Sequence, residues 1–304
     1  MCKGDEALKL NKKSKLIILS SALFLLLILI FTSLYLSNNI FTVTYYEVES
    51  DKINNSIRVV QLSDLHNSEF GEDNKELTDE IKKLEPDLII TTGDMLDGYE
   101  DEYQTVKNLL SELSKIAPLY SSNGNHEIMY DNFAAVKSGD VYSEHSTLLE
   151  KEYVEIEIKG QKLRIGGVYG YCLPEIYLNN NKAHRDVSLF VKEFQDTELF
   201  TLLMCHMPVC FIENSGLDLW EVDLVFSGHA HGGQVRLPFI GGLYAPDQGL
   251  FPGEVSGLYH SGDGEKTMVL SRGLGSSKNI PRFNNIPELT VTDILPKEVI
   301  LNNE

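Results

Sequence analysis

The sequence has few cysteines and far fewer basic than acidic residues. Four Cys in 304 residues are too few for a small fold held together by disulfides. Lys and Arg total 26 against 45 Asp and Glu, which gives a net charge of −19. Nucleic-acid binding depends largely on Lys and Arg that neutralise phosphates, so DNA and RNA are not expected partners. Internal repeats and low-complexity tracts are also missing, which excludes a solenoid and a disordered chain.

One long apolar run interrupts an otherwise ordinary globular composition. Hydrophobic residues make up 42% and charged residues 23% of the chain, as in a typical folded domain. Residues 16–36 read LIILSSALFLLLILIFTSLYL and contain no charged side chain. A helix of this length spans roughly 30 Å, the thickness of a bilayer's hydrocarbon core. We therefore predict one N-terminal transmembrane helix over residues 16–36.

The charges on either side of this run predict its orientation. Residues 1–15 contain five Lys, whereas residues 37–51 contain no Lys or Arg. The positive-inside rule places residues 1–15 in the cytoplasm as a short tail and the rest of the chain outside. A cleaved signal peptide is the alternative, but the run exceeds the usual apolar region and no small-x-small cleavage site follows it. The expectation is a single-pass cell-membrane protein, with residues 37–56 as a polar tether to a domain over residues 57–304.

Strands and helices alternate from the start of this domain. Apolar runs at 57–62, 87–92 and 118–122 predict strands, and helical spacing predicts helices over 74–85 and 102–116. This order predicts parallel strand pairing with right-handed crossovers in one α/β domain. Further along we predict a hairpin of 152–158 with 162–169, a helix over 185–195, and strands over 200–204, 224–226, 267–271 and 289–294.

Residues of the types that bind metals follow five of the predicted strands. Each short motif alone occurs often by chance. The joint occurrence of two Asp, one Asn and four His at the ends of strands in one domain is not expected by chance. Binding sites in α/β sheets form beyond the carboxyl ends of the strands. The motifs are SDLH with Asp64 and His66, GDMLD with Asp94 and Asp97, NGNHE with Asn125, His126 and Glu127, CHMP with His206, and GHAHGG with His229 and His231.

The chemistry of these side chains points to a catalytic metal centre. Carboxylate, imidazole and amide groups without thiolate suit Mn²⁺, Fe or Zn²⁺ at a catalytic site. Seven ligands are too many for one tetrahedral ion. Two divalent metal ions about 3.5–4 Å apart that share a carboxylate accommodate them, and this spacing suits hydroxide attack on phosphorus.

The ordered set D-x-H, G-D-x-x-D, G-N-H-E, H-x-P and G-H-x-H resembles the calcineurin-like metallophosphoesterases over about residues 59–295. The segments GHAHGGQV, SRGLGSS and PRFNNIPELT behind an N-terminal anchor are similar to its membrane-associated branch of UDP-2,3-diacylglucosamine hydrolase-like and YkuE-like phosphoesterases. The resemblance implies an α/β fold, a four-layer sandwich of two mixed β-sheets flanked by helices.

The resemblance also implies roles for individual residues. His126 would donate a proton to the leaving oxygen, and Asp97 and Glu127 would orient the metal ligands. Arg272, in a loop near the last strands, is a weaker candidate for a phosphate contact. The first ion would be held by Asp64, His66 and His231, and the second by Asn125, His206 and His229, with Asp94 bridging the two.

The expected activity is metal-dependent hydrolysis of phosphoesters. We expect a phosphodiesterase that uses a hydroxide activated by two metal ions, acting on a lipid-linked or cell-envelope substrate. The alternatives are a phosphomonoesterase, a nucleotide phosphodiesterase, or a catalytically silent metal-binding scaffold on the membrane. Residues 239–260, rich in Gly, Pro and aromatics, form either an apolar lip facing the bilayer or an ordinary folded loop. We expect Cys172, Cys205 and Cys210 to be buried free thiols, and the oligomeric state stays open.

Overall fold

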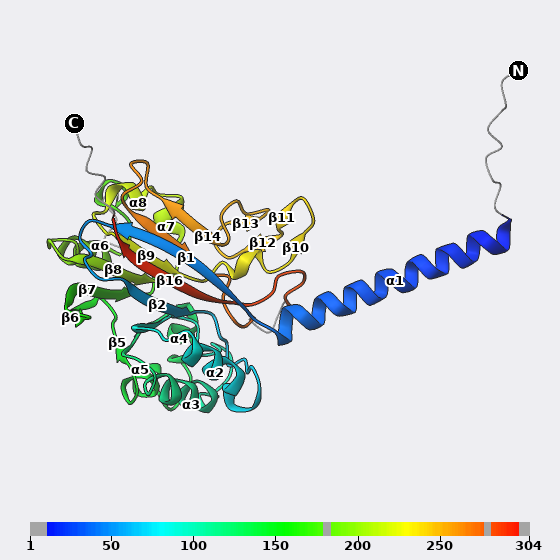
Figure 1. Ribbon diagram of the computed structural model, residues 1–304, viewed down its shortest axis with the longest axis horizontal. Helices are drawn as coiled ribbons and strands as arrows, with labels where there is room; N and C mark the ends of the chain where they lie inside the picture. The colour runs from blue at the N-terminus through cyan, green and yellow to red at the C-terminus, as the bar shows by residue number, and fades with distance from the viewer. Residues whose placement is uncertain (1–10, 179–183, 277–280, 298–304) are drawn as a thin grey trace, which may run out of the picture.

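Two six-stranded mixed sheets form the body of the molecule (Figure 1). The computed structural model describes residues 11–178, 184–276 and 281–297. Most of the expected cytoplasmic tail, residues 1–10, lies outside the described residues. The first sheet has the order β1 (Thr42–Ser50), β16 (Glu288–Pro296), β2 (Ile57–Leu62), β3 (Leu88–Thr92), β4 (Leu119–Ser122) and β5 (Thr147–Leu148). The second has the order β14 (Gly257–His260), β15 (Thr267–Leu270), β9 (Leu224–Ser227), β8 (Phe200–Cys205), β7 (Gln161–Val168) and β6 (Glu152–Ile158).

Three apolar clusters separate four layers. Strand β2 alternates, so that Ile57 and Val59 belong to the cluster between the sheets, whereas Val60 and Leu62 belong to an outer cluster. The outer cluster of the first sheet is completed by α2 (Lys75–Lys83) and α3 (Gln104–Leu113), and that of the second sheet by α6 (Arg185–Phe194). The predicted four-layer sandwich is therefore confirmed, because both faces of each sheet are apolar and must be covered.

The predicted strand pairing is also observed. Strands β2, β3 and β4 pair in parallel with α2 and α3 as crossovers, and β6 and β7 form the predicted antiparallel hairpin. The shorter elements are α4 (Asn125–Tyr130), α5 (Ser138–Ser143), α7 (Val209–Ile212), α8 (Gly216–Leu219), η1 (Glu72–Asn74), η2 (Glu175–Tyr177) and η3 (His231–Gly233). The three cysteines 172, 205 and 210 are buried and free, as expected.

The predicted tether over residues 37–56 is wrong. Most of it is strand β1, which pairs in parallel with β16 along its whole length, from Thr42 opposite Glu288 to Ser50 opposite Pro296. The segment TVTYYEVES is rich in β-branched and aromatic residues that favour strands. Its partner strand lies more than 240 residues away, so local sequence could not show the pairing. The folded body therefore begins at β1, directly after the first helix.

Helix α1 (Lys12–Asn39) projects away from the body (Figure 1). Its most apolar 18-residue window has a mean hydropathy of 2.7 and is 0% buried, so it is long and apolar enough to cross a membrane. Its last turns contact the body. The backbone N–H groups of Asn284 and Asn285 donate to the hydroxyls of Ser33 and Ser37, at 2.9 and 3.0 Å. Asn38 donates through Nδ2 to the backbone oxygen of residue 282 at 3.0 Å.

Two short hairpins protrude from the body on the side from which α1 leaves it (Figure 1). They comprise β10 (Arg236–Leu237), β11 (Gly241–Gly242), β12 (Tyr244–Ala245) and β13 (Gly249–Leu250). Strand β10 pairs with β11, and β12 pairs with β13. We call residues 236–252 the hairpin segment.

Candidate metal centre

Loops from both sheets bring the predicted site residues together. Asp64 and His66 follow β2, Asp94 follows β3, and Asn125 and His126 begin α4 after β4. From the second sheet, His206 follows β8, and His229 and His231 follow β9. All of these side chains except that of Asn125 are buried. Both sheets carry these residues at the carboxyl ends of their central strands, which is where α/β sheets form binding sites.

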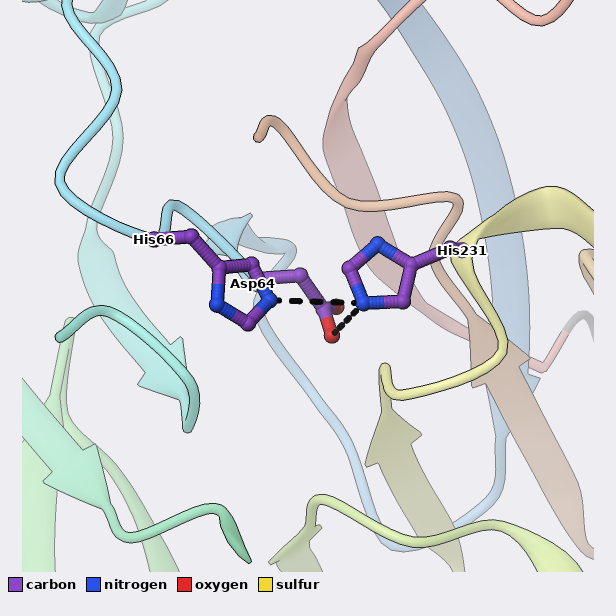
Figure 2. Close-up of side chains that lie close together, drawn as sticks. All are labelled: Asp64, His66 and His231. Carbon is purple, nitrogen blue, oxygen red and sulfur yellow. Dashed lines mark hydrogen bonds and ion pairs between the residues drawn. The ribbon is translucent and has the colours of Figure 1, made fainter. Parts of the chain in front are cut away.

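Asp64, His66 and His231 form the first group of ligand-type atoms. Figure 2 shows the two imidazole rings approaching each other with the Asp64 carboxylate beside them. Nε2 of His66 lies 3.3 Å from Nε2 of His231, and Nε2 of His231 lies 3.5 Å from Oδ1 of Asp64. Three buried ligand-type atoms from two loops therefore converge on one point.

These distances fit a bound cation. Two atoms that are each about 2.1 Å from one ion, at the tetrahedral angle, lie about 3.4 Å apart. Burial lowers the pKa of His66 well below its usual value, and burial together with Arg282 does the same for the pKa of His231. Both rings are then neutral at physiological pH and can offer a lone pair to a metal. The group has the spacing that a divalent cation requires, and neither ring carries a charge that would repel one.

Asp94, His206 and His229 form a second group, and Asp94 also forms a group with His126 and with His66 of the first group. Oδ2 of Asp94 is 3.1 Å from Nε2 of His206 and 3.9 Å from Nε2 of His66. Burial favours the neutral carboxyl, but His206 and its neighbours bring the pKa of Asp94 well below its usual value. Although burial opposes it, Asp94 raises the pKa of His206 to about 10. Without a cation, a proton on His206 supplies the positive charge that the ionised Asp94 requires.

Asp247 fixes the orientation of His229, and sequence reasoning missed it. Its Oδ2 lies 3.0 Å from Nε2 of His229, so Nδ1 is the ring nitrogen left to face the centre. The backbone N–H of His229 donates to Oδ1 of Asp64 at 2.9 Å. Histidines that bind metals commonly donate their other ring N–H to a carboxylate. Asp247 stands in the turn between β12 and β13, where an Asp looks like an ordinary turn residue.

Asn125 and His126 enter the centre from the start of α4. Oδ1 of Asn125 is buried and has no hydrogen-bond partner among the described residues, which suits a metal ligand. The backbone N–H of His126 donates to Oδ1 of Asp94 at 2.8 Å. The side-chain Nδ1 of His126 accepts the N–H of Gly98 at 3.0 Å. The neutral ring of His126 therefore carries its proton on Nε2.

The two predicted orienting carboxylates differ in their contacts. Glu127 accepts the backbone N–H groups of Asp94, residue 96 and residue 124, at 2.8, 3.0 and 2.7 Å, and the hydroxyl of Tyr142 at 2.9 Å. Glu127 therefore holds the loop that presents Asp94. Asp97 is buried, and its Oδ1 accepts the N–H of Tyr99 at 3.0 Å. The orienting role of Asp97 stays a prediction.

The backbone around the site is strained and tightly packed. Gly124 and Gly228 leave room for the two central carboxylates, because a Cβ on either would overlap the side chain of Asp94 or of Asp64. Five non-glycine residues of the centre adopt positive φ angles, an uncommon conformation for side-chain-bearing residues that clusters at functional sites. They are Asp64 (52°), His66 (48°), Asp94 (52°), His229 (68°) and His231 (47°).

Two arginines behind the centre have structural partners. The guanidinium of Arg272 forms an ion pair with Glu288, with Nε 2.7 Å from Oε2, so the group expected to contact phosphate is already engaged. Arg282 is fully buried, and its Nη2 lies 3.3 Å from Nδ1 of His231. Burial lowers the pKa of Arg282 to about 10. Arg282 thus braces His231 from behind, and its place in PRFNNIPELT was the available signal.

Comparisons with known proteins agree with this geometry. The family model described as calcineurin-like phosphoesterase matches residues 57–233, which include every candidate ligand from Asp64 to His231. The chain is 29% identical to the metallophosphoesterase YkuE of Bacillus subtilis over 265 residues, covering 84% of this chain and 86% of that protein.

Two further relatives have named activities. The UDP-2,3-diacylglucosamine pyrophosphatase LpxG of Chlamydia muridarum is 24% identical over 277 residues, which cover 77% of this chain and 82% of LpxG. The phosphodiesterase YaeI of Escherichia coli is 26% identical over 253 residues, which cover 78% of this chain and 82% of YaeI. The similarity to all three relatives extends over most of both chains.

Proposed function

The chain belongs to the calcineurin-like phosphoesterase family, and from that premise we propose that it is a membrane-anchored phosphodiesterase with two divalent ions at its centre. It is a metal-dependent hydrolase that acts on phosphoester bonds. The observation that carries the proposal is the shared Asp94 carboxylate, whose Oδ2 lies 3.1 Å from Nε2 of His206 in one group and 3.9 Å from Nε2 of His66 in the other.

The ion ligands follow from these two groups. Asp64, His66 and His231 would hold one ion. His206, His229 and the unpartnered amide oxygen of Asn125 would hold the other, and Asp94 would bridge them. The mixed donor set suits Mn²⁺, Fe or Zn²⁺. When bound, such ions supply Lewis-acid charge that activates water for attack on phosphorus and neutralises the phosphate oxygens.

His126 is the proposed proton donor to the leaving oxygen. The N–H of Gly98 donates to Nδ1 at 3.0 Å, so Nε2 is the nitrogen from which His126 would donate. The donor would be the protonated ring, with Nδ1 released from Gly98, and transfer of the Nε2 proton to the leaving oxygen would return the neutral ring. The ring packs edge-on against His66 with 4.4 Å between centroids, and this position beside the first group of ligands supports the role. Asp97 and Glu127 would serve as orienting carboxylates, and Arg272 would reach phosphate only after leaving Glu288.

The proposed substrate is a phosphodiester attached to a lipid or to another component of the cell envelope. The similarity to a UDP-2,3-diacylglucosamine pyrophosphatase and to a phosphodiesterase supports this choice. The acidic body supports it too, because 21 Lys and Arg against 43 Asp and Glu after residue 15 do not favour a long nucleic acid.

Helix α1 is the proposed uncleaved anchor. Ser37, in its last turns, is fully buried and accepts a hydrogen bond from Asn285, which supports a helix that remains part of the mature protein. The five Lys before the span support an N-terminal tail in the cytoplasm. The catalytic domain would then lie outside the cell membrane, with residues 16–36 in the bilayer.

The experiment that tests this function compares three substrates for the full chain, purified in detergent and loaded with Mn²⁺. We expect a soluble aryl phosphodiester and a lipid-linked diester to be hydrolysed faster than an aryl monoester, and a chelator to abolish all activity. Asp140→Asn, on an exposed residue of α5, is a control that should change none of these rates. Faster hydrolysis of the monoester would favour the phosphomonoesterase alternative instead.

A further inference from the structure

The hairpin segment exposes large apolar side chains in the turn of its first hairpin and at the end of its second. Phe239 is fully exposed, at 109% of the reference area, and Ile240, Leu250 and Phe251 are each at least 60% exposed. Single exposed apolar residues are common, but four large ones within one short segment need a partner surface. Tyr244, at 42%, adds a side chain with an apolar ring and a polar end.

This segment is also nearly free of charge in an otherwise acidic body. Residues 236–252 contain one Arg and one Asp, whereas the chain after residue 15 carries a net charge of −22. The Asp is Asp247, whose carboxylate contacts His229. Anionic headgroups would repel the acidic surface, but they would not repel these two hairpins.

A short series of contacts joins the hairpin segment to the end of α1. The N–H of Arg236 donates to the carbonyl of Phe283 at 3.0 Å, and Nδ2 of Asn284 donates to the carbonyl of Arg236 at 3.1 Å. The backbone N–H of Asn284 donates in turn to the hydroxyl of Ser33 in α1. The base of the hairpins is therefore fixed beside the residues where the apolar helix meets the body, and Figure 1 shows both on one side.

We propose that the hairpin segment inserts its exposed apolar side chains into the same bilayer that α1 crosses. This inference rests on the proposed membrane anchor. It commits to a bilayer because the base of the hairpins is hydrogen-bonded beside the end of the apolar helix, and both leave the body on one side (Figure 1). Tyr244, close to these apolar side chains in the sequence, is of a residue type typical of the membrane–water interface.

The same segment connects the bilayer to the metal centre. Its exposed apolar residues lie in the turn of the first hairpin and at the end of the second, whereas Asp247 in the turn of the second hairpin contacts His229. The centre is thus kept at the membrane surface, where a phosphoester whose apolar part stays in the bilayer can reach it. This deepens the proposed function: the substrate class is an amphiphile with its phosphate at the interface.

Tryptophan quenching tests the insertion directly. Trp220 is the only tryptophan and is 95% buried, so the unmodified chain is an unquenched reference. Phe239→Trp places a reporter at the hairpin tip. Leu189→Trp is the matched control, because Leu189 is 50% exposed on α6, at the opposite end of the body (Figure 1). In vesicles of lipids brominated on their acyl chains, we expect strong quenching for Phe239→Trp and none for Leu189→Trp. Equal quenching of the two variants would overturn the proposal.

A second measurement tests the link to the substrate. For Phe239→Ser combined with Phe251→Ser, the ratio of the rate on a vesicle-borne phosphodiester to that on a soluble aryl diester should fall at least about tenfold, because each buried aromatic contributes that much to partitioning. Leu189→Ser should keep the ratio of the unmodified chain. An unchanged ratio in the double variant would refute the substrate class. If the unmodified chain hydrolyses neither diester, the proposed function fails, while the quenching result still decides insertion.

Discussion

Two consecutive segments of the chain, residues 227–235 and the hairpin segment, differ in almost every physical property. The first is buried, polar and folded through left-handed turns that present His229 and His231. The second is exposed, apolar and built of two-residue strands. The conformation of the first segment depends on partners inside the molecule, such as Asp64, which lies 165 residues away from His229 in the sequence. The exposed apolar side chains of the second segment lack such partners among the described residues, and we propose that they contact lipid.

This difference predicts two kinds of variant. A substitution in the metal loops should lower the hydrolysis of every phosphoester, whereas one at the hairpin tips should affect only substrates that reside in a membrane. Single substitutions can show which residues affect every phosphoester and which affect only membrane-borne ones.

Asp94→Asn should have the largest effect. The amide cannot supply the negative charge that two ions share, so activity should fall by roughly 10⁴-fold or more on soluble and lipid-borne diesters alike, as when one member of a catalytic unit is lost. Elemental analysis should show fewer bound ions per chain. Asp140→Asn controls for the loss of one carboxylate elsewhere. A variant with full metal content and normal turnover would rule out the bridging role.

His126→Ala should lower turnover by about 10²–10⁴-fold, the usual contribution of a general acid. The bound metal should stay at the level of the unmodified chain, because His126 is not among the proposed ligands. The loss should be smaller for aryl diesters with acidic leaving groups, which need little protonation. His260→Ala, on an exposed residue, is the control. Loss of metal from His126→Ala would instead make His126 a ligand.

The motifs were readable from the sequence because metal chemistry restricts the residue types. Asp64, His66, Asp94, Asn125, His206, His229 and His231 were expected together, and the structure brings the six carboxylate and imidazole residues into adjoining groups. The parallel pairing of β2, β3 and β4 was also predictable, since these strands alternate with the amphipathic helices α2 and α3. The roles of the seven site residues as metal ligands stay proposals until metal binding is measured.

The missed features depend on long-range partners. The local sequence of strand β1 does not show its pairing, because its partner β16 lies at the far end of the chain. Asp247 has the sequence context of a turn residue, because its contact with His229 exists only after the hairpins fold back onto the centre. Arg282 contacts His231, 51 residues away, and its place in PRFNNIPELT is the one local signal of a role.

Asp247→Asn tests whether a residue of the hairpin segment can act on the metal centre, because Asp247 lies in that segment but contacts a candidate ligand. Substitution of a carboxylate that orients a metal-bound His typically costs 10–100-fold in metal affinity or activity. We expect a loss of that size in the affinity for one of the two ions, with soluble and lipid-borne diesters affected equally. Glu254→Gln, on an exposed residue just beyond the hairpins, is the matched control. A loss restricted to lipid-borne substrates would place Asp247 with the membrane surface instead.

Asn285→Ala should have the smallest of these effects and should act on stability. Nδ2 of Asn285 donates to the carbonyls of His231 and Gln234, at 2.7 and 3.2 Å. Removal of a buried hydrogen-bonding group costs about 1–3 kcal/mol of unfolding free energy, which lowers the melting temperature by several degrees in a domain of this size. Asn132→Ala, on an exposed residue, should melt with the unmodified chain. Equal melting temperatures for the two variants would contradict this bracing role.

Metal content measured together with diester hydrolysis tests the central claim most directly. The full chain, purified in detergent, is analysed for bound metal and assayed with an aryl phosphodiester before chelation, after chelation and after the addition of Mn²⁺. We predict two divalent ions per chain, loss of hydrolysis when they are removed, and recovery when they return. Hydrolysis that persists in chain free of metal would contradict the account.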